Sequence, residues 1–150
     1  MSIPSLINYD NVNDYENHFI REYCHSPIIT FDSIPITFRR SSFYHAFFKS
    51  SGPDRIKNKF SKSRAQKIDW IKASLQCPKA ELYQGWVKGN IDPLRRVSIT
   101  YGNYIVVVKM RLRGDGVLVG DFITAYTADL GPSLKIKLNP KWKMPIKKDR

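Results

Sequence analysis

The chain has 150 residues, 42% of them hydrophobic, which suffices for one hydrophobic core, so we expect a single domain over residues 1–150. Lysine and arginine number 25 against 13 acidic residues, and the resulting formal net charge of +12 favours a polyanionic partner, nucleic acid before any other. No stretch approaches the ~18 consecutive apolar residues of a membrane-spanning helix, which argues against a membrane protein.

The N-terminal segment, MSIPSLINYDNVNDYENHF, lacks the charged start and apolar run of a secretory signal, so we expect a cytoplasmic protein. Asp10 or Asn11 suits the N-cap of a helix that runs to about Cys24, because apolar residues recur there at helical spacing. Cys24 and Cys77 are the only cysteines and have no metal-ligand spacing, so both are expected as reduced structural thiols.

The segment SPIITFDSIPITF predicts two short strands joined by a turn at residues 32–33. It is followed by FYHAFF, residues 43–48, which fits either the end of a strand or a helix. The histidine in this segment, His45, is either packed among the aromatic residues of the core or available as an acid–base group near neutral pH.

A helix is predicted over residues 61–78, SKSRAQKIDWIKASLQCP, where Ser63 and Gln66 fit a capping box. Its buried stripe consists of three apolar residues at helical spacing: Ile68, Ile71 and Leu75. Arg64 falls on the same face one turn earlier, so its side chain either extends past the edge of the core or reaches into a site.

From residue 82 onward the pattern changes to strands, written LYQGWV, RRVSITY, YIVVVKMRL and VLVGDFITAYTA. Gly102 and Asn103 fit a two-residue hairpin turn, which places Tyr101 opposite Tyr104. One face of this hairpin then packs against helices and comprises Val97, Ile99, Tyr101, Tyr104, Val106, Val108 and Met110. The other face is predicted to be half open and basic, with Arg96, Ser98, Thr100, Ile105, Val107, Lys109 and Arg111.

The connection RGDG decides the orientation of the last strand. A loop of two or four residues places four residues beside Arg96 and Lys109: Gly120, Phe122, Thr124 and Tyr126. A three-residue loop, or a bulge near residues 120–121, reverses the faces. We favour the first register because it sends the aliphatic residues Val119 and Ile123, together with Ala125, to the core.

The tail SLKIKLNPKWKMPIKKDR alternates briefly and predicts a short edge strand. The core is accordingly expected over about residues 27–138, with a mobile basic tail over 139–150. These elements indicate an α+β fold in which N-terminal helices pack on one face of a four- to five-stranded antiparallel sheet.

The predicted open face collects cations and hydroxyl groups, a combination that binds phosphate and that also occurs on ordinary solvated strands. Aromatic residues near these positions could stack an unpaired base or belong to the core: Phe47, Trp86, Phe122 and Tyr126. No metal-ligand motif, phosphate-binding glycine loop or Gly-x-Ser-x-Gly turn occurs, so neither a metal nor a cofactor is predicted. Metal-independent cleavage of RNA remains, with His45 as the proton-transfer group.

Four strings occur in the order FYHAFF, FSKSRAQKIDWIKASLQCP, YIVVVKMR and FITAY. Together they resemble the phage-associated nuclease-like domains of the barnase, EndoU, colicin and RelE-like superfamily (the BECR fold) over about residues 34–130. The resemblance implies N-terminal helices on an antiparallel sheet and a metal-independent ribonuclease; many such domains are toxins. It also implies that five residues line the site on the open face: His45, Arg64, Lys109, Thr124 and Tyr126.

The first hypothesis is therefore a cytoplasmic endoribonuclease of phage or mobile-element type that uses those five residues for catalysis. Its partners would be RNA, tRNA included, and an inhibitory immunity protein. The residues predicted to contact RNA are Arg55, Lys57, Lys59, Lys62, Lys67, Arg96, Arg111 and Phe122. A second hypothesis is a non-catalytic RNA- or DNA-binding module in which His45 belongs to the core, and a third is a domain that docks an acidic protein.

Overall fold

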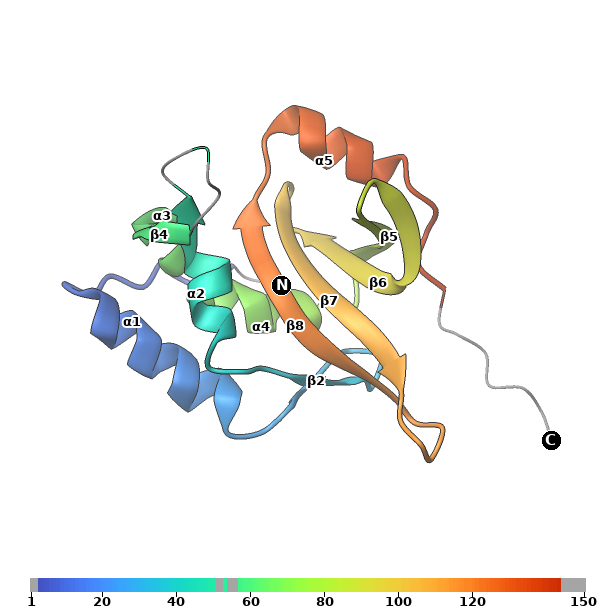
Figure 1. Cartoon of the computed structure of the whole chain (residues 1–150), viewed down its shortest axis with the longest axis horizontal. Helices are drawn as coiled ribbons and strands as arrows, with labels where there is room; N and C mark the ends of the chain where they lie inside the picture. The colour runs from blue at the N-terminus through green and yellow to red at the C-terminus, as the bar shows by residue number, and fades with distance from the viewer. Residues whose placement is uncertain (1–2, 51–52, 54–56, 144–150) are drawn as a thin grey trace.

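The computed structural model describes residues 3–50, 53 and 57–143. The fold is α+β, as predicted. Within the described residues, five α-helices and one π-helical turn accompany a six-stranded sheet and a separate two-stranded sheet (Figure 1). The helices are α1 (Val12–Phe19), α2 (Ser42–Phe47), α3 (Lys62–Ala65), α4 (Ile68–Leu75) and α5 (Leu130–Lys137), and the π-helical turn is η1 (Ile20–Cys24). None of the helices in this part of the chain has the length and apolar content needed to cross a lipid bilayer.

The main sheet has the strand order β1-β2-β8-β7-β6-β5. Its strands are β1 (Ile28–Ile29), β2 (Pro35–Thr37), β5 (Glu81–Val87), β6 (Asn90–Thr100), β7 (Tyr104–Leu112) and β8 (Leu118–Thr127). The prediction of four or five antiparallel strands was wrong, because the β1–β2 hairpin joins the sheet and β2 runs parallel to β8. Gly120 lies against Ile36 of β2, because a Cβ atom at residue 120 would lie 2.7 Å from Ile36 Cδ1 and would displace that side chain.

The N-terminal helix follows the prediction and also contributes to the core. The Asn11 side chain caps α1 by accepting a hydrogen bond from the Asp14 amide at 3.0 Å. Tyr15, Phe19 and Tyr23 are all buried. The core therefore begins well before the expected boundary at residue 27.

The helix predicted over residues 61–78 is divided into α3 and α4. The predicted capping box does not form, because the Gln66 amide donates to Asn8 instead, at 2.7 Å. The buried stripe of α4 is confirmed, with Ile68, Ile71 and Leu75 fully enclosed.

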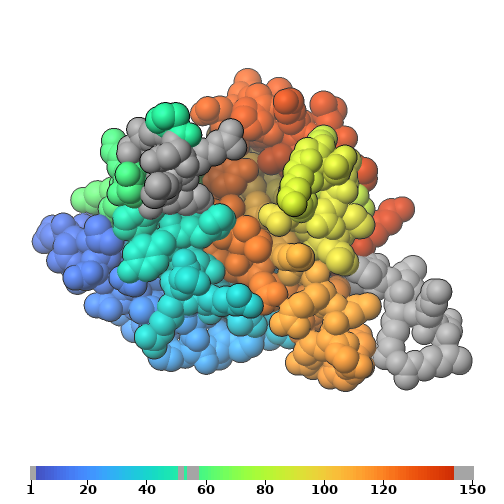
Figure 2. All heavy atoms as spheres, in the orientation of Figure 1, coloured from blue at the N-terminus to red at the C-terminus, as the bar shows by residue number. Residues whose placement is uncertain are grey.

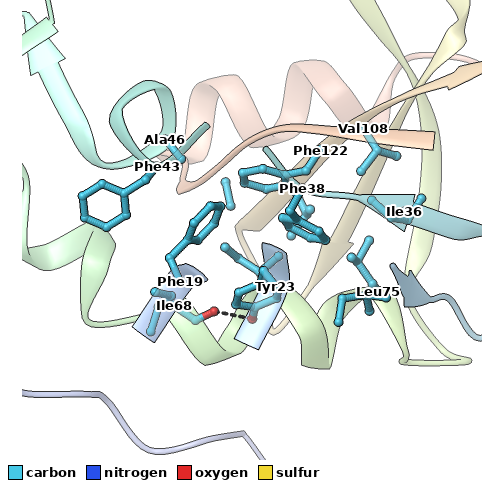
Figure 3. Packing of buried hydrophobic residues seen from close by; sticks show 14 of the residues in the cluster. Phe19, Tyr23, Ile36, Phe38, Phe43, Ala46, Ile68, Leu75, Val108 and Phe122 are labelled. Carbon is cyan, nitrogen blue, oxygen red and sulfur yellow. Dashed lines mark hydrogen bonds between the residues drawn. The ribbon is translucent and has the colours of Figure 1, made fainter. Parts of the chain in front are cut away.

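Side chains from α1 to α4 pack on one face of the sheet and form the larger core (Figure 3). Aromatic rings dominate it, and the rings of Phe38 and Phe122 stack with their centroids 4.7 Å apart. The buried Tyr23 hydroxyl donates a hydrogen bond of 2.6 Å to the Ile68 carbonyl, so the turn after α1 is tied to α4.

The register of the β6–β7 hairpin differs by one residue from the prediction. The turn covers residues 101–103, where Tyr101 and Gly102 both have positive φ angles, 54° and 80°. Thr100, not Tyr101, therefore lies opposite Tyr104. A shift of one residue exchanges the faces of a strand, so the predicted basic face of β6 is buried against the helices: Arg96, Ser98 and Thr100.

A bulge in β8 changes its faces along the strand. Val108 lies opposite Phe122 whereas Val107 lies opposite Thr124, so Ile123 is the extra residue. Before the bulge, the face is set by the five-residue connection 113–117, which puts Phe122 opposite Val108 in the helix-facing core. Phe122 is only 4% exposed, which contradicts its predicted place on the open face. Thr124 shares the face of Val107, as predicted.

The second face of the sheet is partly covered by α5, in the segment where an edge strand was predicted. Ile136 packs there on a second, smaller core of sheet residues: Tyr83, Val97, Ile99, Ile105, Val107 and Ala128. The chain after α5 returns to β5, where the Asn139 amide donates to the Gln84 carbonyl at 3.0 Å. Trp142 is also buried, so the predicted mobile tail is wrong for residues 139–142, and residues 144–150 lie outside the described part.

Arg96 is fully buried on the helix-facing side of β6. Its guanidinium donates to Asp32, with the nearest contact at 2.9 Å, and lies 4.9 Å from the centroid of the Trp142 ring. Burial lowers the pKa of Arg96, and the Asp32 carboxylate opposes this shift. Arg96 thus joins the β1–β2 turn, through Asp32, and the segment after α5, through Trp142, to β6. Its burial removes it from any surface that could meet RNA.

Substitution of Asp32 tests this buried ion pair. We expect Asp32→Asn to lower the free energy of unfolding by about 3 kcal/mol, because it leaves the Arg96 charge buried without a counter-ion. The matched control is Asp115→Asn, which breaks the exposed pair of Arg113 with Asp115 and should cost at most about 1 kcal/mol. Urea denaturation measures the loss of stability in both variants. Equal losses would show that burial does not increase the contribution of the Arg96–Asp32 pair to stability.

Candidate functional site

A groove runs along the face of β8 that is turned away from the main core. Figure 2 shows β8, in orange, at the bottom of a depression between α2 on one side and the end of the β5–β6 hairpin on the other. Three adjoining cavities of about 420, 810 and 100 Å³ make up this depression, which we call the β8 groove. His45 lines the first two cavities and Tyr126 the last two, so each cavity adjoins the next.

His45 is exposed to this groove because of its place in α2. Phe43, Ala46 and Phe47 are fully buried, and they form the inward side of the helix at the spacing i, i+3, i+4. His45 falls on the outward side and is exposed. The alternative of a histidine packed in the core is therefore wrong.

Lys109 lies on the exposed side of β7 and lines the cavity of about 420 Å³ together with His45. Its cross-strand partner on β8 is Asp121, but the Asp121 carboxylate forms an ion pair of 3.1 Å with Arg111. Arg39, which precedes α2, adds another cation to the same cavity. Cations thus outnumber carboxylates around His45.

Tyr126 and Arg64 close the other end of the groove. The Arg64 guanidinium lies 5.6 Å from the centroid of the Tyr126 ring, and it donates a long hydrogen bond of 3.4 Å to the Ala46 carbonyl. Burial lowers the pKa of Arg64 and raises that of Tyr126, and in each case the partner opposes the effect of burial. The Tyr126 hydroxyl is protonated at neutral pH, as in any tyrosine, and can donate a hydrogen bond.

The structure thus places the five predicted catalytic residues along one groove: His45, Arg64, Lys109, Thr124 and Tyr126. Their positions follow from α2, α3, β7 and β8, which meet there. Their catalytic roles stay a prediction.

The residues predicted to contact RNA are not all at the surface. Lys59 and Lys62 are exposed, and Lys67 lines the end of the groove, where its ammonium donates to Thr127 at 2.6 Å. The exposed Arg111 is paired with Asp121, as described above. Two assignments to the open face were wrong because the side chains are buried: Arg96 and Phe122. The backbone of Lys57 belongs to β4, and Arg55 lies outside the described residues.

Sequence reasoning missed four cations of the groove, Arg39, Lys49, Arg95 and Lys135, and left one aromatic undecided. Arg95 lines the largest cavity and Lys49 the smallest. Trp86 also lines the largest cavity and is 48% exposed, whereas Phe47 is fully buried. The correct register of the β6–β7 hairpin would have identified Arg95, since it shares a face with Lys109.

Two lysines face each other beside the groove. In the small sheet of β3 (Phe48–Ser50) and β4 (Lys57–Phe60), Lys49 is the cross-strand partner of Lys59. Like charges in this position repel, and no carboxylate among residues 3–50, 53 and 57–143 forms an ion pair with either one. A polyanion in the groove would relieve that repulsion.

The described residues also contain no group of three or more His, Cys, Asp and Glu side chains that could hold a metal ion.

The repulsion predicts opposite effects on stability and binding. Lys59→Glu should raise the free energy of unfolding by a few tenths to about 1 kcal/mol at low ionic strength, because it turns a repulsive cross-strand pair into an attractive one. The same change should weaken binding to an RNA homopolymer. Lys79→Glu, an exposed cation that lines none of the three cavities, is the control and should weaken binding less. Thermal unfolding and fluorescence anisotropy measure the two effects, and a loss of stability in Lys59→Glu would contradict the prediction.

Comparison with known proteins gives no match: no family model fits the chain, and no curated protein or solved structure is significantly similar to it.

Proposed function

We propose that the β8 groove binds RNA and cleaves it as a metal-independent endoribonuclease. The observation that carries the proposal is the position of His45, which is exposed where two cavities join. On one side of it lies the cation Lys109, and on the other lie Thr124 and Tyr126. The formal net charge of +12 supports a polyanionic ligand.

The proposed reaction is attack of a ribose 2′-oxygen on the adjacent phosphorus. The bond from the 2′-oxygen to phosphorus forms, and the bond from phosphorus to the 5′-oxygen breaks, which gives a 2′,3′-cyclic phosphate and a 5′-hydroxyl end. His45 accepts the proton of the 2′-hydroxyl or returns one to the leaving oxygen, because histidine titrates near neutral pH. Lys109 neutralises the charge that develops on the phosphate oxygens.

Tyr126 and Thr124 supply neutral hydroxyl donors in this scheme. The Tyr126 hydroxyl lines the groove and is protonated at neutral pH, so it can donate a hydrogen bond to a phosphate oxygen or to the leaving oxygen. Arg64 lies over the Tyr126 ring, where it positions the ring and adds positive charge at the end of the groove. Lys59, Lys62 and Lys67 would contact the RNA backbone beyond this point.

A second candidate function is RNA or DNA binding without catalysis. The observation in its favour is the scarcity of acid–base groups: among the described residues that line the three cavities, His45 is the only histidine and Asp121 the only carboxylate. Since Arg111 holds that carboxylate, the groove offers few partners for a two-residue proton transfer. The first proposal also includes a cytoplasmic location, a role as a toxin, an inhibitory immunity protein and the superfamily resemblance.

Cleavage of RNA is the direct test. Purified protein with total cellular RNA in excess EDTA should give discrete fragments that end in cyclic phosphate, and His45→Gln should abolish them. His25→Gln, which changes an exposed histidine outside the groove, is the matched control and should cleave normally. Mapping of the 3′ ends measures the outcome. Intact RNA that is nevertheless bound by the unmodified protein would establish the binding module instead.

Two further substitutions separate catalysis from folding. Arg64→Ala and Lys109→Ala should each reduce the cleavage rate at least about 100-fold, the lower end of the range for lost charge stabilisation, while the melting temperature changes by only about 2–4 °C. The physical reason is that both side chains line the groove and neither is enclosed in the main core. Rate measurements and thermal unfolding on the same preparations provide the comparison. Losses of cleavage rate that are matched by losses of stability would indicate that these residues have a structural role instead.

A further inference from the structure

We propose that the largest cavity of the β8 groove is a subsite for one unpaired nucleotide next to the scissile bond. In this subsite Trp86 stacks on the base and Arg95 binds a phosphate, together with its cross-strand partner Lys109 at the border with the cavity of about 420 Å³. The inference rests on the proposed function for the identity of the ligand as RNA. It adds Arg95 and Trp86 to the residues of the site and defines the substrate as single-stranded.

The path of β6 explains how Arg95 reaches the groove. Gln84 pairs with Arg96 but Gly85 pairs with Asp92, so residues 93–95 are an insertion opposite a continuous β5. The stem of Arg95 crosses directly over Gly85, where an added Cβ atom would lie 2.7 Å from Arg95 Cγ and 3.0 Å from Cδ. The absence of a side chain at residue 85 thus makes room for Arg95 over β5.

Arg95 and Lys109 form a pair of unsatisfied cations. They are direct cross-strand partners, and cations in this position repel each other. The Nε atom of Arg95 is buried and has no hydrogen-bond partner among the described residues. Asp121, the neighbour of Lys109 on β8, is held by Arg111. A phosphate bound between the Arg95 guanidinium and the Lys109 ammonium would neutralise both charges, which is the recognition that an arginine and a lysine provide in phosphate sites.

The wall beside Arg95 is apolar and aromatic. Trp86 and its cross-strand partner Ile91 are both exposed, and both line the cavity. Val97, Val107 and Ile123 also line the cavity, whose volume of about 810 Å³ is within the range of ligand sites. An exposed tryptophan beside cations is typical of sites for single strands, because the bases of a duplex are already stacked on each other. His45 lines the same cavity, which places this nucleotide next to the proposed reaction.

Binding measured without cleavage tests the subsite. In the His45→Gln background, anisotropy of a labelled single-stranded RNA oligonucleotide is compared with that of a duplex of the same sequence. Trp86→Ala should weaken single-strand binding by about 5- to 150-fold, the range for one lost stacking contact. The control Leu94→Ala removes an exposed side chain of the same hairpin that does not line the cavity, and it should change little.

The phosphate contact is tested by charge. Arg95→Gln should weaken binding and reduce the slope of log affinity against log salt by about 1, the value for one lost phosphate contact. Lys88→Gln removes an exposed cation from the turn of the same hairpin and should leave the slope nearly unchanged. Gly85→Ala, which retains every charge but displaces the Arg95 stem, should weaken binding as Arg95→Gln does. Melting temperatures establish that each variant is folded.

The outcomes separate the subsite from the catalytic proposal. Equal effects of Arg95→Gln and Lys88→Gln, equal effects of Trp86→Ala and Leu94→Ala, or tighter binding of the duplex would overturn the subsite even if the unmodified protein cleaves RNA. If the unmodified protein leaves RNA intact but Trp86→Ala and Arg95→Gln lose single-strand binding as expected, the subsite stands and the endoribonuclease proposal fails.

Discussion

The pairing of β7 with β8 is the constraint on which both sides of the molecule depend. One extra residue, Ile123, changes the face of β8 within the strand, so that Phe122 enters the aromatic core and Thr124 turns to the groove. One side of β8 therefore contributes to the core under the helices α1–α4, and its other side forms the floor of the candidate site. Side chains placed on a central strand have less freedom than side chains on loops, which suits a site that must hold a phosphate in a defined position.

The location of most elements could be predicted from the sequence, because helical and alternating spacing are local properties. The stripe of α4, the N-cap at Asn11 and the four long strands were identified in this way. The register of the sheet could not be predicted, because it depends on turn geometry. Tyr101 adopts a positive φ angle, which residues other than glycine seldom adopt. That single residue decides whether Arg96 or Arg95 faces the groove.

The candidate site was predicted in its chemistry better than in its shape. His45 was identified as an acid–base candidate from its residue type, although its segment was left open between strand and helix. Thr124 and Tyr126 were assigned to the correct face, but they reach it through the bulge at Ile123, which was not predicted there. The walls of the groove could not be predicted, because α5 replaces an expected strand and β2 joins the sheet in a parallel direction. The tail after α5 was expected to be mobile because of its charge, but Trp142 provides an apolar ring that covers Arg96, and burial of that ring outweighs the basic neighbours.

The burial of Arg96 has a consequence for the order in which the chain assembles. Its counter-ion, Asp32, is 64 residues away in the sequence, and its aromatic cover, Trp142, comes after every strand of the sheet. A guanidinium remains hydrated until both groups are in place, since water is its best partner in their absence. We therefore expect this corner of the core to close late in folding, after the β6–β7 and β7–β8 hairpins have formed from contacts close in sequence.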